Sequence, residues 1–357
     1  MAWPKLKSPV FLIVYSLITI GLVFISISSL TEASASFNNK FYFLQKQLFW
    51  IILGSISLYL FSIIDLNILK KYSLHFYLFS ILLLILVLIP GIGTKTLGAR
   101  RWLDLGFFPF QPSEIFKFAA VIFFPHLLAN NPQKSIYSFL LYLLPPFILI
   151  ILEPNLSTAI LILFIIISIY FISGGKILPL LGVGAVFSLF IFILIITSPY
   201  RKDRLQSLLN PDKNSYHSQQ IVISLGSGGL NGKGLANSDQ KYSFLPKITT
   251  DSIIAIIGEE TGFIGISIIL YLYFILLSYL FKFSRLIKNE YHSLLVSGIT
   301  CWLSFQTIIN LSAITSIIPL TGVPLPLISY GGSSLVTTMS AIGIILNIEQ
   351  KQNNEKN

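Results

Sequence analysis

Residues 177–197 read ILPLLGVGAVFSLFIFILIIT and decide the fold class. A helix needs about 20 consecutive, mainly apolar residues to cross the ~30 Å hydrocarbon core of a bilayer. The stretch carries no charge, and it is followed at once by the polar run SPYRKDRLQSLL (198–209). It therefore predicts a membrane-spanning helix that ends at a water-facing loop.

Nine other apolar stretches of similar length lie along the chain. Together the ten cover residues 10–29, 48–64, 72–89, 115–129, 136–152, 156–172, 177–197, 263–281, 294–314 and 333–348. The chain is 54% hydrophobic and 11% charged, with a mean hydropathy of +0.80, whereas soluble domains carry about 25% charged residues. We therefore expect an all-α polytopic membrane protein with about ten transmembrane helices, formed by one integral membrane domain over residues 1–357.

The Lys and Arg residues on short loops predict the orientation. One side receives eleven of them: Lys5, Lys7, Lys70, Lys71, Lys134, Lys176, Lys282, Arg285, Lys288, Lys351 and Lys356. The other side receives five: Lys40, Lys46, Lys95, Arg100 and Arg101. Because Lys and Arg resist translocation, we expect both termini and the short tail 349–357 to be cytoplasmic. The large loop 198–252, between spans seven and eight, then faces outward, and the first span reads as a retained anchor.

Charge and cysteine content narrow the classes further. The net charge of +10 suits anionic lipid headgroups, and we expect no nucleic-acid partner for a chain this apolar. Cys301 is the single cysteine and lies inside a predicted span. An intramolecular disulfide or a cysteine metal site is therefore excluded.

Positively and negatively charged residues lie close together in the sequence near the start of the fourth apolar stretch. Arg100 and Arg101 stand beside Trp102, and Glu114 and Lys117 lie one helical turn apart. Arginine binds phosphate oxygens in a bidentate manner and tryptophan favours the membrane interface, so a phosphorylated lipid headgroup is the expected ligand. Two plainer alternatives stay open: the arginines could only anchor to headgroups, and Glu114 could only pair with Lys117.

The polar island between residues 198 and 251 is the second candidate region. It contains a glycine-rich run at 225–235, which includes Lys233, and it ends at Asp251 just before apolar sequence resumes. The glycines suit either a phosphate cradle or a flexible turn, since they permit close backbone approach and positive φ angles. Asp251 could be a helix N-cap, but an ionisable group next to hydrocarbon is costly and marks a candidate functional site.

Two features in the C-terminal part of the sequence predict contacts with other parts of the protein: a pair of adjacent acids and a loop rich in proline and glycine. Glu259 and Glu260 cannot point the same way on a helix, so at least one must face a partner or a cavity. Residues 319–334 hold three prolines, three glycines and no charge, which predicts a re-entrant loop buried in protein before the tenth span. We expect this loop to provide the hydrogen-bonding partner that Asn310 needs in mid-span.

An ordered set of motifs resembles the SEDS family of shape, elongation, division and sporulation proteins, over nearly the whole chain. The motifs are GARRW (98–102), QPSE (111–114), EP (153–154), GGLNGKG (228–234), LP (245–246), TD (250–251), PLP (324–326) and ISYGGSS (328–334). Within the family the chain looks more like division-type than elongation-type members, because of Glu153-Pro154 and the SDQK run at 238–241.

The resemblance implies a peptidoglycan glycosyltransferase of the bacterial cytoplasmic membrane, acting at the division septum. Such an enzyme polymerises lipid II, the undecaprenyl-pyrophosphate-linked disaccharide pentapeptide, on the outer face. The implied protein partners are a class B penicillin-binding protein, which cross-links the new strand, and other division proteins. Asp251 matches the family's essential acidic residue. The expected substrate-binding residues are Arg100, Arg101, Glu114, Lys117, Lys233, Ser329, Tyr330, Gly331 and Gly332.

The implied chemistry assigns roles to these side chains. Glycan extension needs a base that takes the proton from the acceptor's 4-hydroxyl, and cations that stabilise the departing pyrophosphate. Asp251 fits the base, and Arg100, Arg101, Lys117 and Lys233 fit the cations. Because the transfer inverts the anomeric centre, one base suffices without a covalent intermediate. The sequence demands no cofactor, and a divalent cation (Mg²⁺ or Mn²⁺) at the pyrophosphate stays open.

The approach to Asp251 departs from the family pattern. Family members commonly read Leu-Pro-Glu-x-His-Thr-Asp-Phe, where this chain carries Lys247, Thr249 and Ser252 in place of the acid, the histidine and the aromatic residue. The candidate base is present, but its surroundings are altered.

Three other functions remain as alternatives: a lipid II flippase, a polymerase of cell elongation, and a division scaffold that only recruits its partner. A flippase should need polar residues in the inner halves of the spans as well. The charges cluster at the outer mouth, which favours the enzyme.

Overall fold

The computed structural model describes residues 8–96, 99–104, 106, 109–131, 134–209, 216–238 and 250–356. Within these ranges, ten apolar helices occupy the ten stretches predicted from the sequence. They are α1 (Pro9–Ser28), α3 (Tyr42–Ile63), α5 (Ser73–Leu88), α6 (Pro112–Ala129), α7 (Ile136–Leu152), α8 (Leu156–Ile172), α9 (Ile177–Thr197), α12 (Ile253–Leu286), α13 (Glu290–Ile314) and α14 (Gly332–Lys356). The predicted all-α polytopic architecture is confirmed.

Seven of these helices are long and apolar enough to cross a membrane, judged by length and composition. The other three, α5, α7 and α8, are 16 or 17 residues long, slightly below the ~20 residues of a typical span. The chain is a multi-pass membrane protein.

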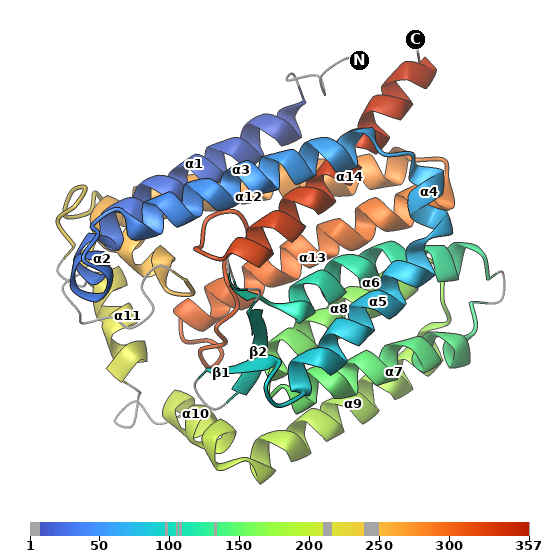
Figure 1. Ribbon diagram of the computed structural model, residues 1–357, viewed down its shortest axis with the longest axis horizontal. Coiled ribbons are helices and arrows are strands. Elements are labelled where there is room, and N and C mark those ends of the chain that lie inside the picture. Colours follow the sequence, from blue (N-terminus) through green and yellow to red (C-terminus); the bar gives the residue numbers. More distant parts are fainter. Residues whose placement is uncertain are drawn as a thin grey trace.

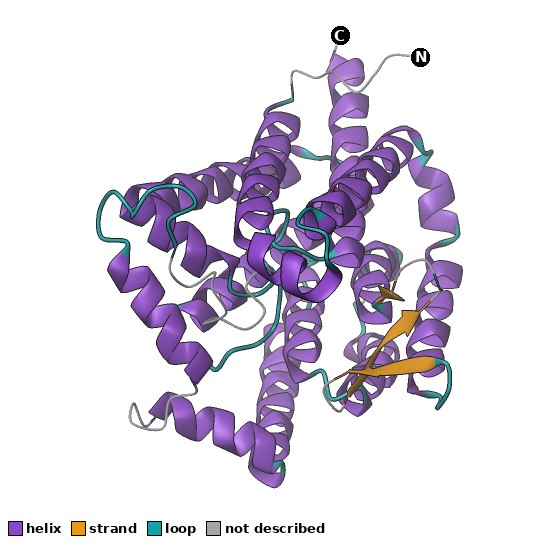
Figure 2. Cartoon of the chain, turned by 60° about the vertical axis from the view of Figure 1, so that its left-hand side comes forward, coloured by secondary structure: helices purple, strands orange, loops and turns teal. Residues whose placement is uncertain are grey.

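The connecting segments include short helices and a small sheet. The short helices are α2 (Leu30–Phe37), α4 (Leu66–Lys71), α10 (Pro199–Leu209) and α11 (Tyr216–Ser227), and the strands are β1 (Gly93–Thr96), β2 (Ala99–Asp104) and β3 (Pro109–Phe110). The strands form an antiparallel sheet in the order β1-β2-β3 at one edge of the helical bundle (Figure 2). The start of α1 and the C-terminal part of α14 lie on the opposite side of the molecule from α10 (Figure 1), and Ser8 Oγ donates to Glu349 Oε2 there at 2.7 Å.

Helix packing is closest between α3 and α14. A Cβ at Gly343 would come within 2.4 Å of the Leu58 carbonyl oxygen, and one at Gly54 within 2.5 Å of Met339 Sδ. Small residues at such positions let membrane helices approach closely, which strengthens van der Waals packing. Helices α6 and α13 lie in the buried interior, whereas α9 is peripheral and buries only Leu180 and Phe187.

Two helices extend further than their apolar stretches. α12 begins at Ile253, ten residues before the predicted span, and it is broken at Gly262, which has φ 66° and ψ −163°. α14 continues to Lys356, so the expected tail 349–357 prolongs this helix within the described residues. Residues 315–331 between α13 and α14 are non-helical, as the prolines and glycines predict.

Candidate active site

Asp251 lies immediately before α12 and is half-buried. Its Oδ1 accepts a hydrogen bond from Thr250 Oγ1 at 2.7 Å, and its backbone carbonyl accepts one from Asn310 Nδ2 at 3.2 Å. The N-cap position of α12 belongs to Ser252, so the N-cap alternative for Asp251 is not what the structure has. Thr250 thus holds the carboxylate, and Asn310 holds the backbone of the same residue.

The proline- and glycine-rich loop borders this carboxylate. A Cβ added at Gly322, whose φ is +69°, would lie 3.8 Å from Asp251 Oδ2. The loop's carbonyl groups bond to helix side chains: Asn310 Nδ2 donates to Val323 O at 2.8 Å and Gln306 Nε2 donates to Pro324 O at 2.9 Å. The predicted partnership between Asn310 and this loop is confirmed. Such bonds are what irregular backbone requires when it is buried among membrane helices.

A second buried polar group lies next to Gln306, on α6. Lys117 Nζ pairs with Glu114 Oε1 at 2.9 Å, donates to Gln306 Oε1 at 3.0 Å, and lies 5.1 Å from the centre of the Trp302 ring. Trp302 Nε1 also donates to Gln306 Oε1, at 2.7 Å. The expected pairing of Glu114 with Lys117 is therefore present, and the side chain of Lys117 is only 1% exposed.

Successive turns of α13 connect these two groups. Trp302, Gln306 and Asn310 are four residues apart, so they share one face of the helix. Gln306 contacts Lys117 and the loop, while Asn310 contacts the loop and Asp251. A partner for Asn310 was predicted from the sequence, whereas Gln306 was not predicted to take part. The four-residue spacing of polar side chains inside an apolar stretch was the signal that could have found it.

Arg100 and Arg101 point in different directions, as neighbours on a strand do. Arg100 Nη1 lies 3.4 Å from the Leu88 carbonyl oxygen at the end of α5. Arg101 Nε donates to the Glu153 carbonyl at 3.2 Å, and its Nη2 donates to the Pro154 carbonyl. The two arginines thus brace β2 against α5 and against the turn between α7 and α8.

The side chain of Glu153, which stood out in the sequence only as part of the motif EP (153–154), is a buried carboxyl at that turn. It is 0% exposed, and neither carboxylate oxygen has a hydrogen-bond partner among the described residues. Burial raises the pKa of Glu153 to about 8, against the opposing effect of the nearby Arg101 charge. At neutral pH the folded protein therefore holds this side chain mainly in its neutral form.

The last loop motif packs on α3. The rings of Tyr330 and Phe43 meet edge to face with centroids 5.4 Å apart. A Cβ at Gly332 would come within 2.0 Å of Trp50 Cε2. Ser329 Oγ accepts from the Leu325 amide at 2.9 Å, and Gly331 O accepts from the Leu335 amide at 2.9 Å. These residues complete the loop that borders Asp251, and their contact with substrate stays a prediction.

Lys233 lies apart from the α6 group. Its Nζ pairs with Glu259 Oε1 at 2.7 Å, so the expectation that Glu259 or Glu260 faces a partner is confirmed. The role of Lys233 as a substrate ligand stays a prediction. Gly98, Lys241 and the unusual approach Lys247-Ile248-Thr249 lie outside the described residues.

The comparisons with known proteins agree over almost the entire chain. Residues 8–354 match the model of the FtsW/RodA/SpoVE family, described as cell cycle protein. The probable peptidoglycan glycosyltransferase FtsW of Coxiella burnetii is 35% identical, with 95% of each chain covered. The stage V sporulation protein E of Bacillus subtilis is also 35% identical, with 94% of each chain covered.

A solved structure extends this similarity to the fold. It comes from work on the structural coordination of polymerization and crosslinking by a peptidoglycan synthase complex. The matched chain is 27% identical with a TM-score of 0.79, and the match covers 96% of this chain and 97% of the other.

Proposed function

This chain belongs to the FtsW/RodA/SpoVE family of cell cycle proteins, and from that membership we propose that it is a peptidoglycan glycosyltransferase that polymerises lipid II. The observation that carries the proposal is the placement of Asp251. Its half-buried carboxylate lies beside Gly322, and α13 links it through Asn310 and Gln306 to the buried cation Lys117. A base and a cation on one framework are what glycosyl transfer from a pyrophosphate requires.

In the proposed reaction Asp251 accepts the proton of the acceptor sugar's 4-hydroxyl. The freed oxygen attacks the anomeric carbon of the donor, the bond from that carbon to the pyrophosphate oxygen breaks, and the lipid pyrophosphate leaves as an anion. Configuration at the anomeric carbon inverts, because there is one displacement. Arg100, Arg101 and Lys117 stabilise the charge on the leaving group, with Glu114 holding Lys117 in place.

A divalent cation at the pyrophosphate remains part of the proposal. In the part of the chain that the structure describes, no group of three or more His, Cys, Asp or Glu could hold a metal by itself. Most ligands of Mg²⁺ or Mn²⁺ would therefore come from the substrate and water. Polymerisation measured across an EDTA titration tests this requirement.

The finer role that we propose is septal synthesis during division, on the outer face of the cytoplasmic membrane and with both chain ends in the cytoplasm. A class B penicillin-binding protein and other division proteins are the proposed partners. The similarity to a chain from a peptidoglycan synthase complex supports a transpeptidase partner. The division role has weaker support, because a sporulation protein is as similar as a protein named FtsW.

The test is polymerisation of labelled lipid II by the purified protein with its partner transpeptidase. We expect Asp251→Ala to reduce polymerisation by at least about 100-fold while membrane insertion and partner binding persist. Full polymerisation by this variant would refute the catalytic role. Translocation of lipid II in liposomes that is unchanged by Asp251→Ala would support the flippase, and an unimpaired division phenotype would support the scaffold.

A further inference from the structure

The break in α12 is filled by the glycine turn of the island, residues 228–234. In an unbroken helix the amides of Phe263 and Ile264 would bond to the carbonyls of Glu259 and Glu260. Each of these four groups bonds to the turn instead. The bonds are Phe263 N to Gly229 O (2.9 Å), Ile264 N to Leu230 O (3.2 Å), Lys233 N to Glu259 O (2.9 Å) and Gly234 N to Glu260 O (3.0 Å). The turn replaces two lost helical hydrogen bonds with four.

The glycines allow this close approach. A Cβ at Gly228 would lie 2.0 Å from the Gly258 carbonyl oxygen, and one at Gly232 would lie 2.1 Å from the Glu260 carbonyl oxygen. Neither position has room for a side chain. The run that could have been a phosphate cradle is thus a backbone contact with α12.

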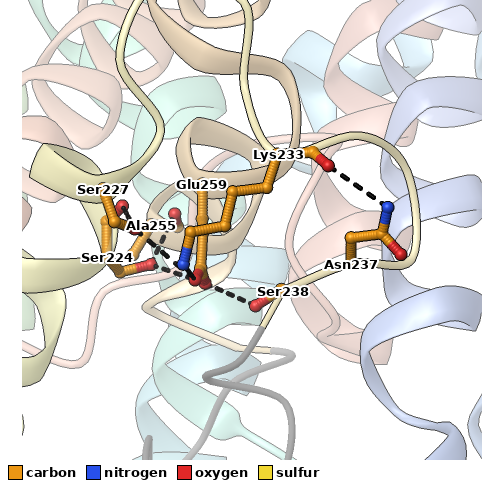
Figure 3. A network of polar contacts seen from close by, with 7 residues as sticks. All are labelled: Ser224, Ser227, Lys233, Asn237, Ser238, Ala255 and Glu259. Atoms are coloured by element: carbon orange, nitrogen blue, oxygen red, sulfur yellow. Dashed lines mark hydrogen bonds and ion pairs between the residues drawn. The ribbon is translucent and has the colours of Figure 1, made fainter.

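The carboxylate of Glu259 adds side-chain bonds to the same contact (Figure 3). Oε1 accepts from Lys233 Nζ at 2.7 Å, and Oε2 accepts from Ser238 Oγ at 2.5 Å. Ser224 Oγ, which donates to the Ala255 carbonyl at 2.9 Å, lies 3.3 Å from Oε2. Because Glu259 is 0% exposed, its charge depends on these donors. All of them come from the island.

Asp251 stands at the other end of the same helical segment. Residues 253–260, between Asp251 and the break, are all buried. At one end of this segment Glu259 binds side chains of the island. At the other end lies Asp251, whose backbone carbonyl accepts the bond from Asn310.

We propose that Glu259 is a positioning residue for Asp251, and that Lys233 acts through Glu259 rather than as a ligand of the pyrophosphate. This inference rests on the proposed function. A carboxylate that must meet a hydroxyl in one geometry is sensitive to small displacements, and a shift of ~1 Å can reduce a rate by about 100-fold. Glu259 therefore sets the rate of transfer, whereas substrate affinity depends on other groups.

A double-mutant cycle tests the assignment, with Glu259→Gln, Lys233→Met and the pair combined. We expect Glu259→Gln to lower the turnover of lipid II by about 10- to 100-fold with the Kd for lipid II nearly unchanged. Lys233→Met should lose less, and the double variant no more than Glu259→Gln alone. If Lys233→Met weakens lipid II binding and the two losses multiply, Lys233 is a substrate ligand and the assignment fails.

The matched control is Glu290→Gln. It removes a third lysine–glutamate pair, Lys134 with Glu290 at 2.8 Å, in which Glu290 is 52% exposed. This pair is remote from Asp251 in sequence. We expect polymerisation by this variant to match that of the wild type. An equal loss of polymerisation activity in Glu290→Gln and Glu259→Gln would show that general destabilisation, and not the positioning of Asp251, causes the loss.

A distance measurement separates this inference from the proposed function. Spin labels at Leu235→Cys in the island and Phe274→Cys on α12, both exposed positions, would be placed in a Cys301→Ser background. We expect one narrow distance distribution that broadens in Glu259→Gln. An unchanged distribution would overturn the positioning role even if activity falls. A wild-type protein that shows the narrow distribution but makes no glycan would instead refute the proposed function.

Discussion

Two lysine–glutamate pairs, each with a buried carboxylate, are built differently. Glu114 and Lys117 are three residues apart on α6, 2.9 Å from each other, with both side chains at most 4% exposed. Lys233 and Glu259 are 2.7 Å apart, join two separate segments, and leave the lysine side chain 32% exposed. The first pair is a local feature inside the bundle, whereas the second fastens a loop to a helix. The difference indicates that the stability of the fold depends on the pair Glu114–Lys117, whereas the position of the island depends on the pair Lys233–Glu259.

Breaking the inner pair should have the largest effect. Lys117→Met leaves Glu114 buried without its cation, and Glu114 Oε2 already lacks a hydrogen-bond partner among the described residues. Removing one partner of a buried pair typically costs about 3–5 kcal/mol. We expect a large fall in the thermal unfolding midpoint of the detergent-solubilised protein, together with loss of polymerisation.

The control for this prediction is the double variant Lys117→Met/Glu114→Gln, which removes both charges of this pair. It should recover most of the stability but none of the activity. Equal unfolding midpoints for the single and double variants would contradict the importance of the unpaired carboxylate.

Glu153 sharpens the comparison, because it is a buried carboxyl with no hydrogen-bond partner on its oxygens in the described structure. Its pKa is raised to about 8, so between pH 5 and 8 the folded state keeps a proton that the unfolded state has lost. Stability from this group is fully present below the unfolded pKa of 4.5 and is lost as pH rises through the folded pKa of about 8, by about 5 kcal/mol in all. We expect Glu153→Gln to flatten the fall in unfolding midpoint over this range. Identical pH profiles for the wild type and this variant would show that Glu153 is not buried as the structure has it.

The third effect concerns Arg101, whose guanidinium bridges two carbonyls of one turn. A lysine keeps the charge but not the fork-shaped set of donors. We expect Arg101→Ala to weaken lipid II binding by about tenfold and Arg101→Lys by less. Titration of labelled lipid II against both variants measures this, and negligible effects of both would leave Arg101 only its contacts with the turn between α7 and α8.

The smallest effect should come from Lys134→Met. Its partner Glu290 is half-exposed, and exposed pairs typically contribute less than about 1 kcal/mol. The unfolding midpoint should stay close to that of the wild type. A fall as large as that of Lys117→Met would contradict the expectation that the buried pair Glu114–Lys117 contributes more to stability than the partly exposed pair Lys134–Glu290.

The sequence predicted the features that follow from placing a segment in an apolar environment, namely which segments are helical and which polar groups need a partner. An apolar run in a bilayer must satisfy its backbone internally, so 177–197 could only be a helix, and 319–334 could not be one. The same reasoning required a partner for Asn310. Glu114 and Lys117 were predictable as a pair because their spacing places them on one face.

The sequence did not predict what depends on contacts between distant segments. The strands 93–96 and 99–104 are too short and too polar to stand out from a loop. The sequence around Gly262 does not by itself predict a break in the helix, because the break depends on contact with the distant turn at 228–234. Likewise the opposed directions of Arg100 and Arg101 follow from a strand that no periodicity in so short a segment could establish.

The crossed backbone contact at the break in α12 has a consequence for biogenesis. Gly232 precedes Gly262 by thirty residues, so the turn is synthesised before the break in α12. The second half of α12 therefore forms its hydrogen bonds with a segment that is already present. If the two segments did not meet, the four backbone groups of α12 at the break would lose their partners in the turn, at several kcal/mol for each group that stays buried. Folding of the island and completion of α12 are thereby coupled into one assembly step, because the hydrogen bonds at the break form only when both segments are present.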